Sequence, residues 1–231
     1  MTSPNIASNR FVLLYQSSVG KKLLTGVSGL ALVIFVVIHM AGNLLLLVSP
    51  DAYNQYGHRL ESLGPLLWGG ELLLLGAVLL HAAIGVTIFV RRLQARPEGY
   101  QVYASSGTPS YQTLSSRTMI VTGAVLAAFL LWHLLTFKFG VRYQVPGTAT
   151  RDLARLVIEK FRQPLYAFGY TGVMVLLASH LRHGIWSALQ SLGVLNTPLR
   201  AVAYGVSAVL AVGTALGFVA LPLAIYFGWV A

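Results

Sequence analysis

Four of the six histidines in this chain lie inside long apolar stretches, one to a stretch: His39, His81, His133 and either His180 or His183. An ionisable imidazole in the hydrocarbon of a membrane is costly, and such a residue marks a functional site by default. One histidine in each of four stretches predicts two pairs of side chains rather than four unrelated ones. Two imidazole pairs are what two bis-histidine haems b require.

The composition predicts a membrane protein that crosses the bilayer several times. Of the 231 residues, 56% are hydrophobic and 10% are charged, which is more apolar surface than a soluble domain of this size can cover. The absence of cysteine excludes disulfides, thiolate-bound metal, iron–sulfur ligation and covalent haem attachment. The net charge of +10 is typical of basic flanks that set topology and contact anionic lipid, and it would also suit an acidic partner. Nucleic-acid binding is not expected, because no soluble basic domain is present to carry it.

Five apolar runs are long enough to cross a bilayer, which takes about 20 residues. The runs are Leu23–Val48, Leu66–Val90, Thr118–Phe139, Leu165–Leu189 and Ala201–Val230. They are continuous rather than alternating, so they indicate helices and not a closed barrel. The expected fold is all-α, a single transmembrane domain over residues 1–231 whose five helices bundle around two haems b. Pro222 is expected to kink the last helix.

Two of the connections carry local signals. The segment Ser49–Pro65 is rich in Pro, Gly, Asn and Tyr and is predicted to be a loop. In the segment RDLARLVIEKF, one helical face collects four apolar side chains, those of Leu153, Leu156, Val157 and Phe161. This pattern predicts a short helix that lies on the membrane surface.

The depth of each histidine follows from its distance to the basic residues that end its run. At about 1.5 Å per residue, His39 and His133 lie roughly 25 Å from the inner ends of their helices, and His81 and His180 lie roughly 15 Å from theirs. Depth therefore pairs His39 with His133 and His81 with His180, in layers about 10 Å apart. His183 would lie about 10 Å from the inner end, so depth favours His180 as the partner of His81.

Small residues one turn from three of these histidines leave room for a flat ring, but they equally suit close packing of membrane helices. They are Gly42, Gly85 and Gly184. For a single histidine, a core imidazole bonded to a neighbouring helix is the alternative, and the matched depths weigh against it. A zinc or proton-transfer site usually recruits carboxylates, and Glu71 is the one acid clearly inside a run, which favours haem.

Three longer segments resemble a known family. They are SVGKKLLTGVSGLALVIFVVIHMAGNLLL, AYNQYGHRLESLGPLLW and HLRHGIWSALQSLG. Together they resemble the cytochrome b membrane-anchor subunit of succinate dehydrogenases and fumarate reductases (succinate:quinone oxidoreductases), of the single-subunit, five-helix, di-haem type. The resemblance extends from about Val19 to Gly193. It implies a distal haem b held by His39 and His133 and a proximal haem b held by His81 and His180.

The resemblance further implies the partners and the reaction. A flavoprotein subunit with FAD and an iron–sulfur subunit would carry the dicarboxylate chemistry, so no residue catalytic for that chemistry is expected in this chain. This subunit would pass electrons between the iron–sulfur partner and a membrane quinone, with menaquinone favoured over ubiquinone. The expected location is a bacterial or archaeal cytoplasmic membrane, in contact with lipid, and a higher oligomer is left open. In the family pattern HxxxG followed by an aromatic residue, His180, Gly184 and Trp186 match.

Haem propionates need basic partners. Arg92 and Arg182 are candidates near the proximal layer, Lys138 is a candidate near the distal layer, and His183 is a further candidate to support a propionate or line a quinone pocket. For each of these cations, a contact with lipid headgroups is the alternative.

Two clusters of polar side chains could bind the quinone. The outer cluster is preferred, because two haems make most sense when the quinone is remote from the iron–sulfur partner. It comprises Asn43, Tyr53, Tyr56, Glu61 and Glu71, and the inner alternative comprises Ser28, Trp186 and Gln190.

Orientation follows from basic pairs that directly abut the ends of two runs. Lys21 and Lys22 precede the first run, and Arg91 and Arg92 follow the second, which places the N-terminus in the cytoplasm and the C-terminus outside. Two rival functions share the same features: a di-haem cytochrome b of a hydrogenase or formate dehydrogenase type, and a non-redox carrier of protons or metal. A purely structural anchor whose histidines bind nothing is a third.

Overall fold

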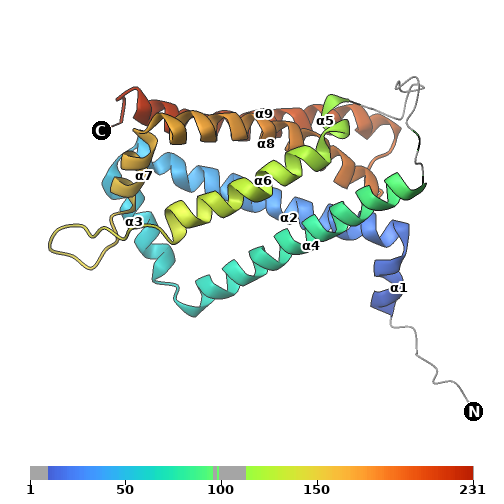
Figure 1. Ribbon diagram of the computed structural model, residues 1–231, viewed down its shortest axis with the longest axis horizontal. Coiled ribbons are helices and arrows are strands. Elements are labelled where there is room, and N and C mark those ends of the chain that lie inside the picture. Colours follow the sequence, from blue (N-terminus) through green and yellow to red (C-terminus); the bar gives the residue numbers. More distant parts are fainter. Residues whose placement is uncertain (1–9, 96–97, 99–112, 231) are drawn as a thin grey trace, which may run out of the picture.

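The computed structural model describes residues 10–95, 98 and 113–230, and in this part of the chain the secondary structure is helical (Figure 1). Among the described residues, five helices are long and apolar enough to cross a membrane. They are α2 (Ser18–Leu44) with the 3₁₀ turn η1 (Leu45–Leu47), α4 (Pro65–Ala95), α6 (Met119–His133) with the π-helical turn η2 (Leu134–Lys138), α8 (Pro164–Ser191) and α9 (Thr197–Tyr226). The prediction of an all-α chain with five spans is confirmed, and the spans agree with the predicted runs to within a few residues. Pro222 does not interrupt α9, which continues to Tyr226.

Polar residues set the ends of the long helices. The Ser17 hydroxyl accepts a hydrogen bond from the Gly20 amide at 2.8 Å and begins α2, and the Asn196 side chain accepts one from the Leu199 amide at 3.1 Å and begins α9. Gly193, with φ of 72°, takes a left-handed conformation just after α8 ends, which suits a residue without a side chain. The tight turn between α8 and α9 therefore follows from the local sequence.

Four shorter helices lie at the two ends of the bundle. They are α1 (Arg10–Gln16), α3 (Pro50–Glu61), α5 (Leu114–Arg117) and α7 (Leu153–Phe161). Helices α1 and α5 lie at one end, and α3 and α7 lie together at the other (Figure 1). The end of the bundle that carries α3 and α7 is called the outer end below.

The prediction of a loop over Ser49–Pro65 is wrong, because α3 occupies most of it. The Ser49 hydroxyl accepts a hydrogen bond from the Ala52 amide at 3.0 Å, Pro50 starts the helix, and Asp51 lies in the first turn, where a negative charge is favourable. These are ordinary start signals for a helix.

The short helix predicted near residue 153 exists as α7, and its apolar face is covered by protein rather than left for lipid. Its apolar side chains are buried inside the protein, with Leu156 1%, Val157 4% and Phe161 6% exposed. Val157 and Phe161 pack in a core cluster with Tyr53 of α3 and Tyr170 of α8. The apolar face that suggested a lipid contact is therefore covered by the bundle itself.

The long helices bury little on their outward faces. Helices α8 and α9 pack along each other, α2 packs against α4, α8 and α9, and α6 packs against α8. Large apolar side chains such as Leu73 (76% exposed), Val209 (72%) and Val175 (63%) face outward. Since only hydrocarbon would cover such surfaces favourably, this pattern agrees with a multi-pass membrane protein.

Candidate functional site

The structure brings the four histidines of the long helices together as two pairs. The imidazole of His39 on α2 lies beside that of His133 on α6, with ring centroids 5.7 Å apart. The imidazole of His81 on α4 lies beside that of His180 on α8, with ring centroids 6.4 Å apart. These are the partners that depth in the bilayer predicts. Below, His39 and His133 are called the outer pair, and His81 and His180 the inner pair.

Both separations suit two imidazoles that share one metal ion. Metal–imidazole bonds of about 2.0 Å, in line on opposite sides of a metal, place the two bonding nitrogens about 4 Å apart. Adding about 1 Å from each nitrogen to its ring centre gives a centroid separation of about 6 Å. The ring planes meet at 87° in the outer pair and 68° in the inner pair, and rotation about the bond axis allows such angles.

Hydrogen bonds determine which nitrogen of His81 carries the proton. Its Nδ1 lies 3.2 Å from the carbonyl oxygen of Thr25, and because a carbonyl only accepts, Nδ1 must donate. The hydroxyl of Ser28 lies 3.4 Å from the same Nδ1 and donates its own proton to the Leu24 carbonyl at 2.7 Å. The Nε2 of the neutral His81 ring therefore keeps its lone pair, which is the form that binds metal.

His180 has a hydrogen-bond partner that can set the same protonation state. Its Nδ1 lies 3.0 Å from the hydroxyl of Thr122, a buried residue of α6. The hydroxyl also lies within hydrogen-bond distance of two backbone carbonyls of its own helix, those of Thr118 at 3.1 Å and Met119 at 3.2 Å. When its single proton goes to one of these carbonyls, as is common for threonine in a helix, the hydroxyl accepts from Nδ1 and His180 also presents Nε2 as a lone pair.

The outer pair has an aromatic surround instead of hydrogen-bond partners. His133 lies against Phe129, Phe137 and Tyr170, and its Nδ1 is buried without a hydrogen-bond partner among the described residues. The α-helix ends at His133, and η2 continues it with π-helical turns, so that the Phe139 amide bonds the Leu134 carbonyl at 2.9 Å. Single π-helical turns occur often at functional sites, where they change the direction of a side chain.

The glycines beside the histidines separate into filled and open positions. The ring of Tyr56 covers Gly42, and a Cβ added there would meet Tyr56 Cε1 at 2.6 Å, so the expectation of free space beside His39 at this residue is wrong. At Gly85 and Gly184, one turn beyond His81 and His180, an added Cβ meets no described atom within 4 Å. Close packing of a neighbouring helix does not explain these two glycines, because no helix covers them.

Three residues of the predicted outer quinone cluster lie together near His39. The Tyr53 hydroxyl donates to the Asn43 side-chain oxygen at 3.0 Å, and the Asn43 amide donates to the carbonyl of His39 at 2.7 Å. Tyr56 covers the neighbouring turn of α2 through Gly42. Burial raises the pKa of Tyr53, with the charge of Arg151 opposing this shift, so the phenol remains a donor.

The two acids of that cluster lie apart from these residues, in ion pairs. Glu71 pairs with Lys138, and Glu61 pairs with Arg142 at 3.2 Å. Both pairs tie the outer ends of α3 and α4 to the segment after α6. Lys138, predicted to contact a propionate, is thus engaged by a carboxylate of the protein.

The residues of the predicted inner quinone cluster also lie in different surroundings. Ser28 is buried against His81, whereas Gln190 is exposed at the end of α8. Trp186 is buried and lies 6.5 Å from the ring of His183, so these two are neighbours on α8. His183 is not the partner of His81.

Of the two basic residues predicted at the inner layer, Arg182 is engaged within the protein. Its guanidinium donates to the hydroxyl of Tyr204 on α9, over whose ring it lies, and to that of Ser115 on α5 at 3.4 Å. Arg92 is exposed near the end of α4.

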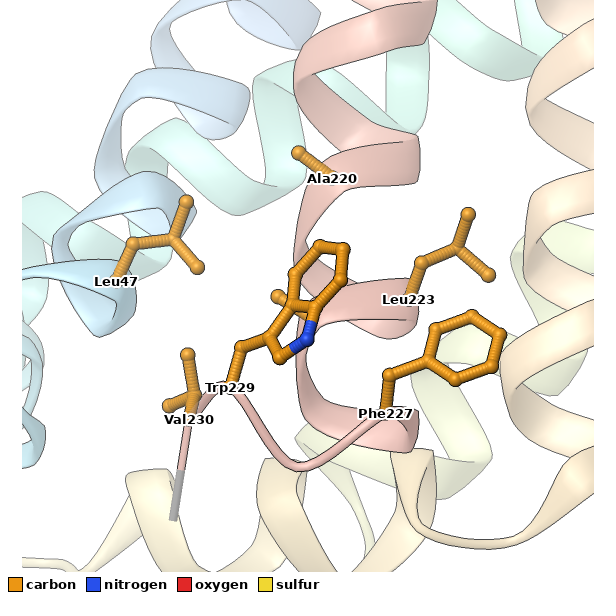
Figure 2. A pocket seen from close by; sticks show the side chains of 7 residues that line it. Leu47, Ala220, Leu223, Phe227, Trp229 and Val230 are labelled. Carbon is orange, nitrogen blue, oxygen red and sulfur yellow. The ribbon is translucent and has the colours of Figure 1, made fainter.

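A pocket of about 450 Å³ opens at the C-terminal end of α9 (Figure 2). Leu47, Ala220, Leu223, Phe227 and Trp229 line it, and none of the predicted quinone residues does. Figure 2 shows that the Trp229 indole lies among the side chains of Leu47, Ala220 and Leu223. This apolar lining suits a hydrocarbon chain better than a polar head.

Four site features escaped sequence reasoning: the Thr25 carbonyl, the Thr122 hydroxyl, the π-helical turn after His133 and the buried Nε atom of Arg151. A weak signal existed only for Thr122, a polar residue in an apolar run that lies about three turns from His133 on the same helix. The other three depend on the tertiary fold.

The arrangement offers two separate pairs of imidazoles, each of which could hold one metal ion. Within the described residues, no three His, Cys, Asp or Glu side chains come together as a metal-binding group, so these ligands occur in twos. In comparisons with known proteins, no family model, no curated protein and no solved structure matches this chain.

Proposed function

We propose that this chain is a di-haem cytochrome b, the membrane anchor of a succinate:quinone oxidoreductase, which transfers electrons between an iron–sulfur subunit and a membrane quinone. The observation that carries the haem assignment is the pair of imidazole–imidazole contacts, at 5.7 Å and 6.4 Å, between helices that lie apart in the sequence. The assignment to this family rests on the resemblance of the three sequence segments given above.

The two imidazoles of each pair would hold one haem iron. At the inner pair, the open space at Gly85 and Gly184, one turn from both ligands, also fits the ring of a haem. When bound, a bis-histidine haem supplies one-electron transfer without an open position for oxygen. The protein residues supply ligation, exclusion of water and a fixed orientation of the rings.

The two pairs differ in how the protein orients them. The Thr25 carbonyl and the Thr122 hydroxyl hold the Nδ1 protons of His81 and His180, which leaves their Nε2 atoms as the ligands. At the outer pair, the imidazole of His133 is oriented by packing against Phe129, Phe137 and Tyr170 instead. Two fixed ligand pairs at different levels make a path for electrons across the bilayer.

We place the quinone at the outer end, near Tyr53, Asn43 and Tyr56. The Tyr53–Asn43 hydrogen bond supplies polar groups that could turn to a carbonyl oxygen, and it lies one turn from His39. The basic ends of α2 and α4 support an inner, cytoplasmic surface at the opposite end, where an iron–sulfur partner would dock.

The proposal is tested by the haem content of the purified full-length chain, measured as a pyridine haemochrome together with a reduced-minus-oxidised spectrum. We expect two haems b per chain, and a low-spin spectrum for both. His39→Ala or His133→Ala should each remove the same haem, and His81→Ala or His180→Ala the other.

His183→Ala and His58→Ala are matched controls, since His183 is not paired with another histidine and His58 is exposed on α3. Both variants should keep two haems. A folded preparation without haem, even after reconstitution, would overturn the cytochrome assignment. If haem is present, co-purification of a flavoprotein with an iron–sulfur protein distinguishes the proposed complex from a hydrogenase or formate dehydrogenase.

A further inference from the structure

Two of the three cations predicted to neutralise cofactor carboxylates are engaged by groups of the protein, and the third, Arg92, lies near the inner end of α4. Lys138 pairs with Glu71, and Arg182 donates to Tyr204 and Ser115. The outer pair of histidines therefore needs another basic residue, if the cofactor held there carries carboxylates.

Arg151 bonds the turn of the chain that follows His133 at the outer end of the bundle. Its Nη2 donates to the carbonyl of Phe137 at 2.7 Å, and the ring of Phe137 lies 5.4 Å from that of His133. Phe137 is one turn beyond His133 on its helix, just as Asn43, which bonds Tyr53, is one turn beyond His39. The charge of Arg151 also lowers the pKa of Tyr53, against the larger effect of burial.

The guanidinium of Arg151 has unused donor capacity in a buried place. Its Nε is buried and has no hydrogen-bond partner, and no carboxylate of the described residues forms an ion pair with it. Burial, with the charge of Arg142, lowers the pKa of Arg151, while Glu61 and Tyr53 oppose this shift. Arg151 as a whole is partly buried, but a buried N–H donor without an acceptor is unfavourable, and a carboxylate would complete it.

We propose that Arg151 binds a propionate carboxylate of the haem held by His39 and His133. This inference rests on the proposed function. A guanidinium presents parallel N–H groups that match the two oxygens of a carboxylate, and the orphaned Nε of Arg151 adjoins the Nη atoms that form such a fork. The Phe137 carbonyl, which lies in the π-helical turn, fixes one Nη and so positions the remaining donors.

The test compares ferric haem with its dimethyl ester, in which both propionates are blocked. Full-length His81→Ala protein, which retains the outer pair, is titrated with each compound in detergent and followed by its absorbance. In this background, Arg151→Gln should weaken binding of haem by about tenfold or more, the usual effect of losing a charged hydrogen bond. It should leave binding of the dimethyl ester unchanged. Arg151→Lys, which keeps the charge but loses the fork, should lie between the two.

Arg155→Gln is the matched control, because Arg155 lies in the same segment but is exposed and paired with Glu159 at 2.9 Å. It should bind both compounds as the parent does. Equal weakening of haem and ester by Arg151→Gln would show that Arg151 only supports the Phe137 carbonyl, and would overturn the inference. An equal affinity of Arg151→Gln and its parent for haem would also overturn it. Failure of the parent to bind either compound would instead refute the outer haem site itself.

Discussion

Thr122 offers the sharpest test of how the protein prepares an imidazole for ligation. Its hydroxyl is the acceptor for Nδ1–H of His180 at 3.0 Å, and the residue is 4% exposed. Thr122→Val replaces the hydroxyl with a methyl group of similar size, so packing changes little. The Nδ1–H of His180 is then buried without an acceptor.

The magnitude follows from the desolvation of that N–H group. Leaving a buried donor unsatisfied costs about 1–3 kcal/mol. Loss of the outer-shell partner of a metal-bound histidine typically weakens metal affinity about 10- to 100-fold, which is the same range of energy. We therefore expect Thr122→Val to weaken haem binding at the inner pair by about 10- to 100-fold, with no effect at the outer pair.

The assay is a titration of the full-length apoprotein with haem, with the two low-spin sites separated by electron paramagnetic resonance. Thr122→Ser, which keeps the hydroxyl, should bind nearly as the wild type does. Thr171→Val is the control, because the Thr171 hydroxyl bonds the Ala167 carbonyl of its own helix at 2.8 Å. Unchanged affinity at both sites in Thr122→Val would refute the argument that this hydroxyl orients a ligand.

Three further predictions concern other parts of the chain. Gly85→Ala and Gly184→Ala should leave the thermal stability of the apoprotein unchanged or slightly raised, since alanine is favoured over glycine in a helix by about 1 kcal/mol. Both variants should nevertheless contain less haem, because each added methyl group enters the open space beside a ligand. Full haem content in both variants would contradict this. Asn54→Ala removes two hydrogen bonds of 2.9 Å, one buried and one part-buried, that join α3 to the start of α7, so the free energy of unfolding should fall by about 1–3 kcal/mol in a denaturant titration. An unchanged midpoint would show that these bonds do not stabilise the fold. Hydrogen bonds from Arg155 and Tyr143 lower the pKa of Glu159, so its stabilising effect is present above the unfolded pKa of about 4.3 and is lost as pH falls through the lower folded value. As the pH is lowered, the melting temperature of the wild type should therefore fall more steeply than that of Glu159→Gln. Melting temperatures that fall in parallel would contradict this.

The pairing of the histidines could be predicted because long apolar runs limit where a residue can lie. Once a run spans the bilayer, its basic ends determine depth, and depth alone associates His39 with His133 and His81 with His180. The ring contacts of 5.7 Å and 6.4 Å show that the same residues meet in the structure. Ligation of iron by them stays a prediction.

Other features were out of reach because they depend on contacts between distant segments. Arg151 looks like an ordinary loop cation in the sequence, and only the fold brings it to the Phe137 carbonyl. The face of α7 is apolar for either of two reasons, lipid or protein, and the pattern cannot distinguish them. Helix α3 could have been predicted, because Ser49, Pro50 and Asp51 are start signals for a helix. The many turn-forming residues in the same segment led to the prediction of a loop instead.

Helix α4 has little of its own to hold it in place. Within Pro65–Ala95, which the structure describes throughout, Ile84 alone is buried. A cofactor bonded to His81 at one face and to His180 on α8 at the other would join this helix to the far side of the bundle as a cross-link. Folding of the bundle and binding of the cofactor at the inner pair would then be one cooperative process. In the apoprotein, α4 would be loosely packed against the other helices, and membrane proteases could recognise it.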